Sequence, residues 1–315
     1  MGQIEFTKFR ELALELGFSD LAFSEIGLVE KHISAYKEWI DEKFQAEMTY
    51  MEKSEAREKM DFILKDASSV ITLVTNYYYK RSNTPKHSAK VARYAYGRDY
   101  HKIITKRLKI LESFLKQNFE GAECRFYIDT GPILERAYAE KSGLGFIGKN
   151  SCLITKNFGS FVFISEIITT IALPENFKAR FDTDKKFSVC GSCNLCMEAC
   201  PTKAIKKPGQ IDANKCISYL TIENKGEIKD EFKDKIKESG YIFGCDICQE
   251  VCPHNVFANE TNDPEFKNKI AGEHLNIKEI LDIEDDEEFL DKFKGSPLMR
   301  AKRKGLQRNA RIFRD

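Results

Sequence analysis

The sequence of 315 residues lacks any run of about 18 apolar residues, the length that a helix needs to cross a bilayer. Its first residues, from Met1 to Glu5, contain no apolar export signal. A surplus of charge is also missing, because the formal net charge is only +1. These absences argue against a membrane protein and a uniformly basic nucleic-acid binder, so any nucleic-acid site must be a local patch. We expect a cytoplasmic protein without a membrane partner.

Cysteine is almost absent outside one segment of the chain. Of the ten cysteines, only Cys124 and Cys152 lie outside residues 190–252. A disulfide framework would spread its cysteines through a small secreted chain, so the clustering favours metal ligation. We expect the two isolated cysteines to be small, buried apolar residues without a role in ligation or catalysis.

The clustered cysteines follow the spacing of a bacterial ferredoxin. The first run is Cys190-x2-Cys193-x2-Cys196-x3-Cys200-Pro201. In such a run the first three cysteines bind one cubane, and the fourth binds the other. The second run is Cys245-x2-Cys248-x3-Cys252-Pro253, and it lacks one middle cysteine. Cys216 is the remaining cysteine of the region, and it completes the count for two cubanes.

The spacing therefore predicts two [4Fe–4S] clusters. We assign Cys190, Cys193, Cys196 and Cys252 to cluster one, and Cys200, Cys216, Cys245 and Cys248 to cluster two. A zinc site is the alternative, because zinc also binds paired Cys-x2-Cys motifs. Zinc does not explain a triple Cys-x2-Cys-x2-Cys run that ends in Cys-Pro.

The residues before the cysteines alternate between helical and strand-like patterns. Apolar spacing predicts helices over residues 4–17, residues 101–117, and from Pro132 to about Ser142. Branched apolar runs predict strands over residues 70–74, 124–128, 152–155 and 161–173. This mixture indicates an α/β or α+β fold. Residues 174–186 are polar and look like a linker, so we place domains over 1–178, 179–260 and 261–315.

The last residues of the chain are rich in basic side chains. From Pro297 a helical pattern places Met299, Leu306, Ala310 and Phe313 on one stripe, and Arg300, Lys304, Arg308 and Arg311 on another. The apolar stripe can dock on the body while the basic stripe meets phosphates. The alternative is a solvated terminal helix.

Five segments resemble the epoxyqueuosine reductase family: Arg93–Lys102, Ile128–Arg136, Gly145–Asn150, Cys216–Glu223 and Gly244–Pro253. The resemblance runs from about Tyr50 to the C-terminus. It implies an α+β protein, with an N-terminal α/β cobalamin-binding domain like that of reductive dehalogenases and nitroreductases, followed by a ferredoxin-like domain with two [4Fe–4S] clusters. Many members continue into a helical-repeat domain, and this chain resembles the short form.

The resemblance also implies a reaction. Members reduce epoxyqueuosine to queuosine at the wobble position of tRNAs with GUN anticodons, using cobalamin that receives electrons through the two clusters. The expected partners are the tRNA anticodon stem-loop and an electron donor such as a flavodoxin or ferredoxin, and the expected state is a monomer. Asp129 matches the catalytic proton donor. The cobalamin-contacting positions are Arg57, Asp129, the backbone near Leu153 and, near the substrate pocket, His101 and Arg136.

The residues themselves leave alternatives open. Asp129 could simply cap the predicted helix, because Asp-Thr-Gly-Pro suits a helix start. As a donor near neutral pH it would need burial, which raises a carboxyl pKa from about 3.9. We expect the glycines of residues 143–150 to let the backbone approach the flat corrin. A reductive dehalogenase and a ferredoxin-type carrier are the competing functions. The missing export signal and the basic tail disfavour the first, and the long N-terminal region disfavours the second.

Overall fold

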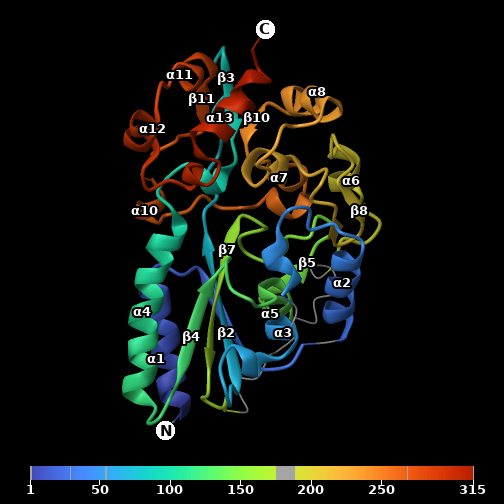
Figure 1. Ribbon diagram of the computed structural model, residues 1–315. Coiled ribbons are helices and arrows are strands. Elements are labelled where there is room, and N and C mark those ends of the chain that lie inside the picture. The colour runs from blue at the N-terminus through green and yellow to red at the C-terminus, as the bar shows by residue number, and fades with distance from the viewer. Residues whose placement is uncertain (1, 29, 54, 175–188, 268, 315) are drawn as a thin grey trace.

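The structure is a computed structural model that describes residues 2–28, 30–53, 55–174, 189–267 and 269–314. A four-stranded sheet with its helices forms one end of the molecule, and most residues after 189 gather at the other end (Figure 1). The predicted linker over residues 174–186 falls almost entirely outside the described residues, as does the proposed boundary at 178/179. The domain limits therefore stay a prediction.

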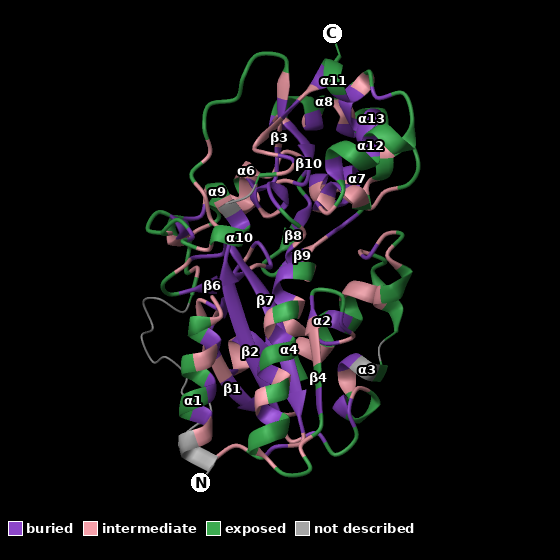
Figure 2. Ribbon diagram, turned by 90° about the vertical axis from the view of Figure 1, so that its left-hand side faces the viewer, coloured by how far each residue is buried: buried purple, intermediate pink, exposed green. Residues whose placement is uncertain are grey.

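The four-stranded sheet has the order β1 (Asp20–Glu25), β2 (Ser69–Asn76), β7 (Val162–Thr169) and β4 (Cys124–Ile128). All of its pairs are antiparallel. Strands β2 and β7 are buried over their whole length (Figure 2), which explains why their sequences are nearly continuous runs of branched and apolar residues. The strands predicted over residues 70–74, 124–128 and 161–173 are confirmed.

Helices cover both faces of this sheet (Figure 1). Helices α1 (Gly2–Glu15) and α4 (Tyr100–Asn118) lie on one face, where their apolar stripes build the largest core cluster around Phe9 and Leu108. Helix α5 (Glu135–Lys141) packs on the other face, with Ala139 against Val74 and Ile164. The first two predicted helices are confirmed, and the predicted mixture of helices and strands with them.

A second sheet joins distant parts of the chain. Strand β3 (Ser88–Val91) pairs in parallel with β10 (Tyr241–Phe243) and antiparallel with β11 (His274–Asn276). The N-terminal half therefore supplies the central strand of a sheet whose two edges come from the C-terminal third. Helices α11 (Ile277–Leu281), α12 (Asp286–Phe293) and α13 (Lys302–Arg311) share one apolar cluster with this sheet.

The remaining described elements are short. The helices are α2 (Glu30–Asp41), α3 (Glu55–Glu58), α6 (Leu195–Ala199), α7 (Ile217–Ile222), α8 (Asp230–Ser239), α9 (Ile247–Glu250) and α10 (Pro264–Lys267), and the strands are β5 (Gly145–Ile147), β6 (Leu153–Thr155), β8 (Ile205–Lys207) and β9 (Gln210–Ile211). Single 3-10 turns are η1 (Thr49–Glu52), η2 (Met60–Phe62), η3 (Arg93–Ala95), η5 (Pro253–Asn255) and η6 (Pro297–Arg300). Among the described helices, none has the length and apolarity needed to cross a membrane.

The basic tail forms η6 and α13, and its predicted apolar stripe is confirmed, whereas one residue of the predicted basic stripe lies elsewhere. Leu306 and Ala310 are fully buried, whereas Lys304 and Arg311 are exposed. Arg308 is only 8 % exposed and donates hydrogen bonds to the carbonyl oxygens of Leu220, Asn224 and Gly226. The prediction that Arg308 lies on a phosphate-binding face is therefore wrong, because its guanidinium joins α13 to the segment that begins with α7.

Candidate active site and iron–sulfur centre

Asp129 follows directly after β4 and has a left-handed backbone, with a φ of 58°. A residue with a Cβ atom adopts this left-handed backbone conformation only at an energetic cost. Such backbone strain often marks a functional site. The Thr130 backbone N–H donates to the Ile128 carbonyl at 2.5 Å, which makes a sharp turn. The turn presents the Asp129 side chain, which is 59 % exposed, at the end of the sheet.

The turn also corrects two expectations about the helix that follows. Helix α5 begins at Glu135, three residues after Pro132, so Pro132 is not in its first turn. The N-cap is Leu134, which makes no side-chain hydrogen bond to the helix. The interpretation of Asp129 as a helix cap is therefore wrong, and its side chain is available for another role.

Two aromatic side chains from the start of α4 orient Asp129. The Tyr100 hydroxyl donates to Asp129 Oδ2 at 2.7 Å, and the His101 Nε2 atom lies 3.8 Å from the same oxygen. Burial and then the Asp129 charge raise the pKa of Tyr100, so its hydroxyl keeps the proton that it donates. The Tyr100 ring stacks on Phe163 with a centroid separation of 4.1 Å, which fixes the hydroxyl in place.

His101 is held by the acid that begins its own helix. Asp99 is the N-cap of α4, and its Oδ1 accepts from the His101 backbone N–H at 3.0 Å and contacts the ring Nδ1 at 2.8 Å. Burial alone would lower the pKa of His101, but Asp99 and then Asp129 raise it above its ordinary value. The buried Nε2 atom has no hydrogen-bond partner among the described residues. The imidazole can therefore form a further hydrogen bond through Nε2, on the side that faces Asp129.

Two further charged groups, Glu135 and Arg300, act on this centre. The Asp129 backbone N–H donates to the Glu135 carboxylate, and burial with the Asp129 charge raises the pKa of Glu135 to about 8. Arg300 from the C-terminal tail forms a two-point ion pair with Glu223, at 2.9 and 2.8 Å, and its charge reaches both Asp129 and His101. The tail thus borders the site through Arg300.

The other residues carried over from the family resemblance each make contacts with their own surroundings. Leu153 is 2 % exposed at the start of β6, so the residue as a whole is buried. Arg136 Nη1 donates to the Ser151 carbonyl at 2.5 Å and thereby holds the turn before β6. Arg57 is buried and donates to the carbonyl oxygens of Lys53 and Tyr50, so it orders its own loop.

The glycine-rich segment has a different use from the one predicted. Residues 145–147 form β5, which pairs with β6 in a hairpin. A Cβ on Gly145 would collide with the Ile154 carbonyl, and one on Gly148 with the Ile154 side chain. The expectation that these two glycines open the backbone to a corrin is therefore wrong, because their bare faces pack inside the hairpin.

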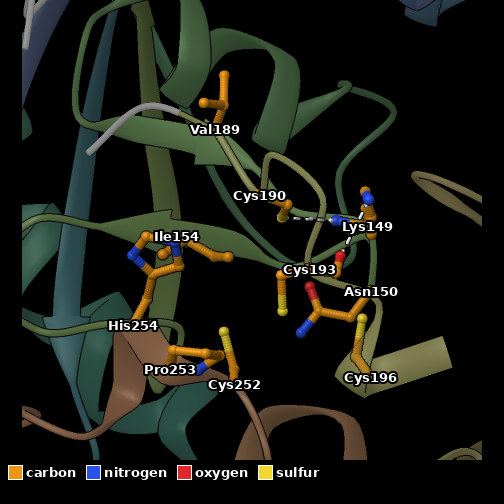
Figure 3. Close-up of a pocket in the computed structure, with 10 residues that line it drawn as sticks. All are labelled: Lys149, Asn150, Ile154, Val189, Cys190, Cys193, Cys196, Cys252, Pro253 and His254. Atoms are coloured by element: carbon orange, nitrogen blue, oxygen red, sulfur yellow. Dashed lines mark hydrogen bonds between the residues drawn. The ribbon is translucent and has the colours of Figure 1, made fainter. Parts of the chain in front are cut away.

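The cysteines fall into two groups. Figure 3 shows a pocket lined by the four cysteines assigned to cluster one, Cys190, Cys193, Cys196 and Cys252. The Lys149 backbone N–H donates to Cys190 Sγ at 3.4 Å, and the Lys149 ammonium donates to the carbonyls of Gly191 and Cys193. Hydrogen bonds to cluster sulfurs are one of the factors that set reduction potential.

The cysteines assigned to cluster two are electrostatic neighbours of one another. Burial raises the pKa of Cys245, and the charges of Cys216 and Cys200 raise it further. The pKa of Cys248 is raised by Cys152 first, then by burial, and also by Cys245 and Cys216. Within the described residues no His, Cys, Asp or Glu set converges closely enough to hold one metal ion. The assignment of the individual cysteines to the two clusters therefore stays a prediction.

The isolated cysteines differ from each other. Cys124 is buried in β4 and donates to Thr169 Oγ1 at 3.5 Å, so it behaves as the expected core residue. Cys152 instead shares a hydrogen bond with the Cys248 thiol. Its position beside a cluster-two cysteine and one residue before Leu153 could not be foreseen, because residues 152 and 248 belong to distant motifs.

A buried ion network holds the second cysteine loop. Asp246 is 2 % exposed, and its Oδ2 accepts from Arg93 Nη1 and Arg81 Nη2, each at 3.1 Å. Glu250 Oε1 accepts from the same two guanidinium groups at 2.7 and 2.9 Å. Both arginines come from the N-terminal half, so that half fixes the loop that carries Cys245 and Cys248.

Comparison with known proteins identifies the family. A family model described as 4Fe-4S double cluster binding domain matches residues 189–255, and one described as epoxyqueuosine reductase QueG, DUF1730 matches residues 57–130. An epoxyqueuosine reductase of Cellulophaga algicola is 39 % identical over 298 residues, which cover 94 % of each chain. The chain belongs to the epoxyqueuosine reductase family. An epoxyqueuosine reductase of Synechocystis is 41 % identical and covers 86 % of this chain and 91 % of its own.

Solved structures of the epoxyqueuosine reductase family agree with this assignment. One, an epoxyqueuosine reductase with an epoxyqueuosine-modified tRNA-Tyr stem loop, is 29 % identical with a TM-score of 0.88 and covers 99 % of this chain and 81 % of that one. Another, from Bacillus subtilis, is 30 % identical with a TM-score of 0.87, and its catalytic aspartate loop is swung out of the active site. The predicted family, the enzyme class and the double-cluster domain are confirmed.

Proposed function

We propose that this chain reduces epoxyqueuosine to queuosine in tRNA, with Asp129 as the proton donor. The observation that carries the proposal is the strained, exposed Asp129 turn, held by the Tyr100 hydroxyl and faced by His101. Support for the substrate comes from the related structure with a modified tRNA stem loop. Loss of the epoxide oxygen as water requires two electrons and two protons, and a positioned carboxylic acid can supply one proton.

The residues around Asp129 fit a cobalamin cofactor. The corrin ring of cobalamin carries amide side chains, which need hydrogen-bond partners. The buried Nε2 atom of His101 has no partner among the described residues, so it fits a hydrogen bond to one of these amides. The backbone at Leu153 and the Arg136 guanidinium beside it would line the same cofactor, and Arg57 would act through the loop that it orders. Cobalamin, when bound, would supply reduced cobalt, a strong nucleophile or one-electron donor, as the source of reducing power for the epoxide.

The chain's own residues then have separate tasks. Asp129 delivers a proton to the departing oxygen, while Tyr100 and His101 orient its carboxyl group. The protein leaves the Asp129 side chain 59 % exposed, so its burial must come from the bound nucleoside.

Electrons enter through the cysteine region. We propose that cluster one is bound by Cys190, Cys193, Cys196 and Cys252, and cluster two by Cys200, Cys216, Cys245 and Cys248. A flavodoxin or ferredoxin is the proposed donor, and the protein is proposed to act as a monomer. A reducing cytoplasm suits it, because eight thiolate ligands must escape disulfide formation.

The test is Asp129→Asn in a single-turnover assay with pre-reduced protein. The amide is nearly isosteric but cannot donate the proton, so conversion should fall by about 10²–10⁴-fold with both clusters retained. Asp66→Asn is the matched control, because Asp66 is also an exposed aspartate with a positive φ, 57°. Parental turnover by Asp129→Asn would show that Asp129 is not the donor.

A further inference from the structure

Lys149 lies in the turn between β5 and β6, and the proposed reaction gives it no task. Its ammonium group donates to the carbonyl oxygens of Gly191 and Cys193 and to the Asn194 side-chain oxygen, each at 2.9 Å. An ammonium group has three N–H bonds, and each of them has an acceptor here. A lysine side chain is flexible, so three bonds to one loop fix its charge at a single place.

The backbone of Lys149 is also held by hydrogen bonds. Its N–H donates to Cys190 Sγ at 3.4 Å, and its carbonyl oxygen accepts from the Gly209 N–H at 3.0 Å. The Gly148 N–H donates to the Cys152 carbonyl oxygen at 2.9 Å, which closes the turn around Lys149. Lys149 therefore contacts the first cysteine run from an ordered turn, through both its main chain and its side chain.

The next residue, Asn150, bonds to the second cysteine run. Its Nδ2 atom donates to the Cys248 carbonyl oxygen at 3.3 Å, and its Oδ1 atom accepts from the Cys152 N–H at 3.2 Å. Asn150 has no charge, so it can position the loop of Cys248 but cannot stabilise a charge there. Two neighbouring residues of one turn thus contact both cysteine runs, and of the two only Lys149 carries a charge.

Lys149 brings a positive charge to the pocket that holds the four cysteines assigned to cluster one. Figure 3 marks its hydrogen bonds to Cys190 and Cys193 at the wall of this pocket. The described residues that line the pocket include no arginine and no carboxylate. Lys149 is also half-buried, so solvent and salt screen its charge less than they screen a charge on the open surface.

We propose that the Lys149 ammonium raises the reduction potential of cluster one. In one respect the inference rests on the proposed function: cluster one is the cluster assigned to Cys190, Cys193, Cys196 and Cys252. Reduction adds one electron, from a flavodoxin or ferredoxin, and takes the cluster from the [4Fe–4S]²⁺ to the [4Fe–4S]⁺ state without moving a bond or a proton. Because the reduced state is more negative, a fixed positive charge beside its cysteines stabilises it more than the oxidised state. The donor can then fill the cluster more completely.

Redox titration followed by paramagnetic resonance tests the proposal without any substrate. The variant is Lys149→Gln in the reconstituted protein, which removes the charge but keeps two side-chain N–H donors and the backbone bond to Cys190. Iron should stay at about eight atoms per chain, and one of the two cluster midpoints should fall while the other stays parental. At the parental midpoint of the shifted cluster, the ratio of reduced to oxidised cluster should drop at least about tenfold, which corresponds to about 59 mV for one electron.

Two matched variants separate the effect of the charge from an effect on the fold. Lys149→Arg keeps the positive charge and should keep both midpoints parental. Lys141→Gln removes another lysine whose ammonium is bound by three backbone carbonyl groups, those of Glu25, Ile26 and Gly27. These three residues belong to neither cysteine run, so Lys141→Gln should also leave both midpoints unchanged.

The Lys149→Gln variant can refute the inference in two ways. Two parental midpoints in this variant would overturn it, because the charge would then have no effect on either cluster. Loss of one cluster, seen as halved iron content, would overturn it as well, because Lys149 would then serve cluster assembly and not the potential. A midpoint in Lys149→Arg as low as in Lys149→Gln would have the same consequence. If the parent fails to convert epoxyqueuosine while the midpoints behave as expected, the proposed function is refuted and this inference stands.

Discussion

The Arg308→Met substitution separates the two roles that the basic tail could have. The methionine keeps a long apolar stem but removes the guanidinium that donates to Asn224 at 2.7 Å, Gly226 at 2.6 Å and Leu220 at 2.9 Å. A hydrogen bond from a charged donor contributes about 1.5–3 kcal/mol. Burial lowers the pKa of Arg308, so removal of the charge also relieves a desolvation cost. We expect a net loss of about 2–4 kcal/mol in the free energy of unfolding.

Urea unfolding followed by circular dichroism measures this loss, and tRNA titrations at several salt concentrations measure the other role. Arg308→Met should lower the unfolding midpoint while the salt slope of tRNA binding stays parental. The matched comparison is a Lys304→Glu, Arg311→Glu double variant, whose sites are exposed. It should keep the midpoint, and it should reduce the logarithmic salt slope by up to about 1.4–1.8 if both side chains meet phosphates. An unchanged midpoint for Arg308→Met, together with a weaker salt slope, would refute this division of roles.

Three further predictions concern the cofactors and the pH response. Cys216→Ala should lose one cluster and retain the other, so iron content after anaerobic reconstitution should fall from about eight atoms per chain; unchanged iron would remove Cys216 from the ligands. The protein should bind about one cobalamin without a histidine ligand to cobalt, and a nitrogen superhyperfine pattern in the cobalt(II) paramagnetic resonance spectrum would contradict this. Asp99→Asn keeps the helix cap but loses the charge that raises the pKa of His101. A raised pKa of a basic group stabilises the fold below its unfolded value of about 6.5. The stability lost in Asp99→Asn should therefore be largest below that pH and shrink as the pH rises through the folded pKa, and a pH-independent loss of the unfolding midpoint would oppose this assignment.

The cysteine groups could be predicted from sequence because cluster chemistry fixes both the number and the spacing of the ligands. Two cubanes need eight thiolates, and the Cys-Pro ends of both runs direct one cysteine of each run to the other cluster. Cys190 and Cys252, from opposite ends of the region, line one pocket, and the division of the eight cysteines between the two clusters stays a prediction. The spacing of the cysteines thus predicted that Cys190 and Cys252, far apart in the sequence, lie close together.

The environment of Asp129 could not be predicted in the same way. The family resemblance pointed to Asp129, but Tyr100 and Glu135 contact it only through the packing of α4 and α5. Arg308 could not be predicted for the same reason. The helical pattern indicates on which face of α13 it lies, but not that carbonyl oxygens of a distant segment lie there to accept its hydrogen bonds.

The position of β3 has a consequence for how this protein can be made and divided. Because β3 lies between β10 and β11, the cluster region cannot complete its sheet without residues 88–91. During synthesis, β3 leaves the ribosome about 150 residues before Tyr241 of its first partner strand, β10. Both edges of β3 therefore stay unpaired until β10 has been made. Unpaired strand edges promote aggregation. A separately expressed cluster fragment that starts after residue 178 would lack its middle strand, and electron transfer and catalysis are thus tied together by the chain itself.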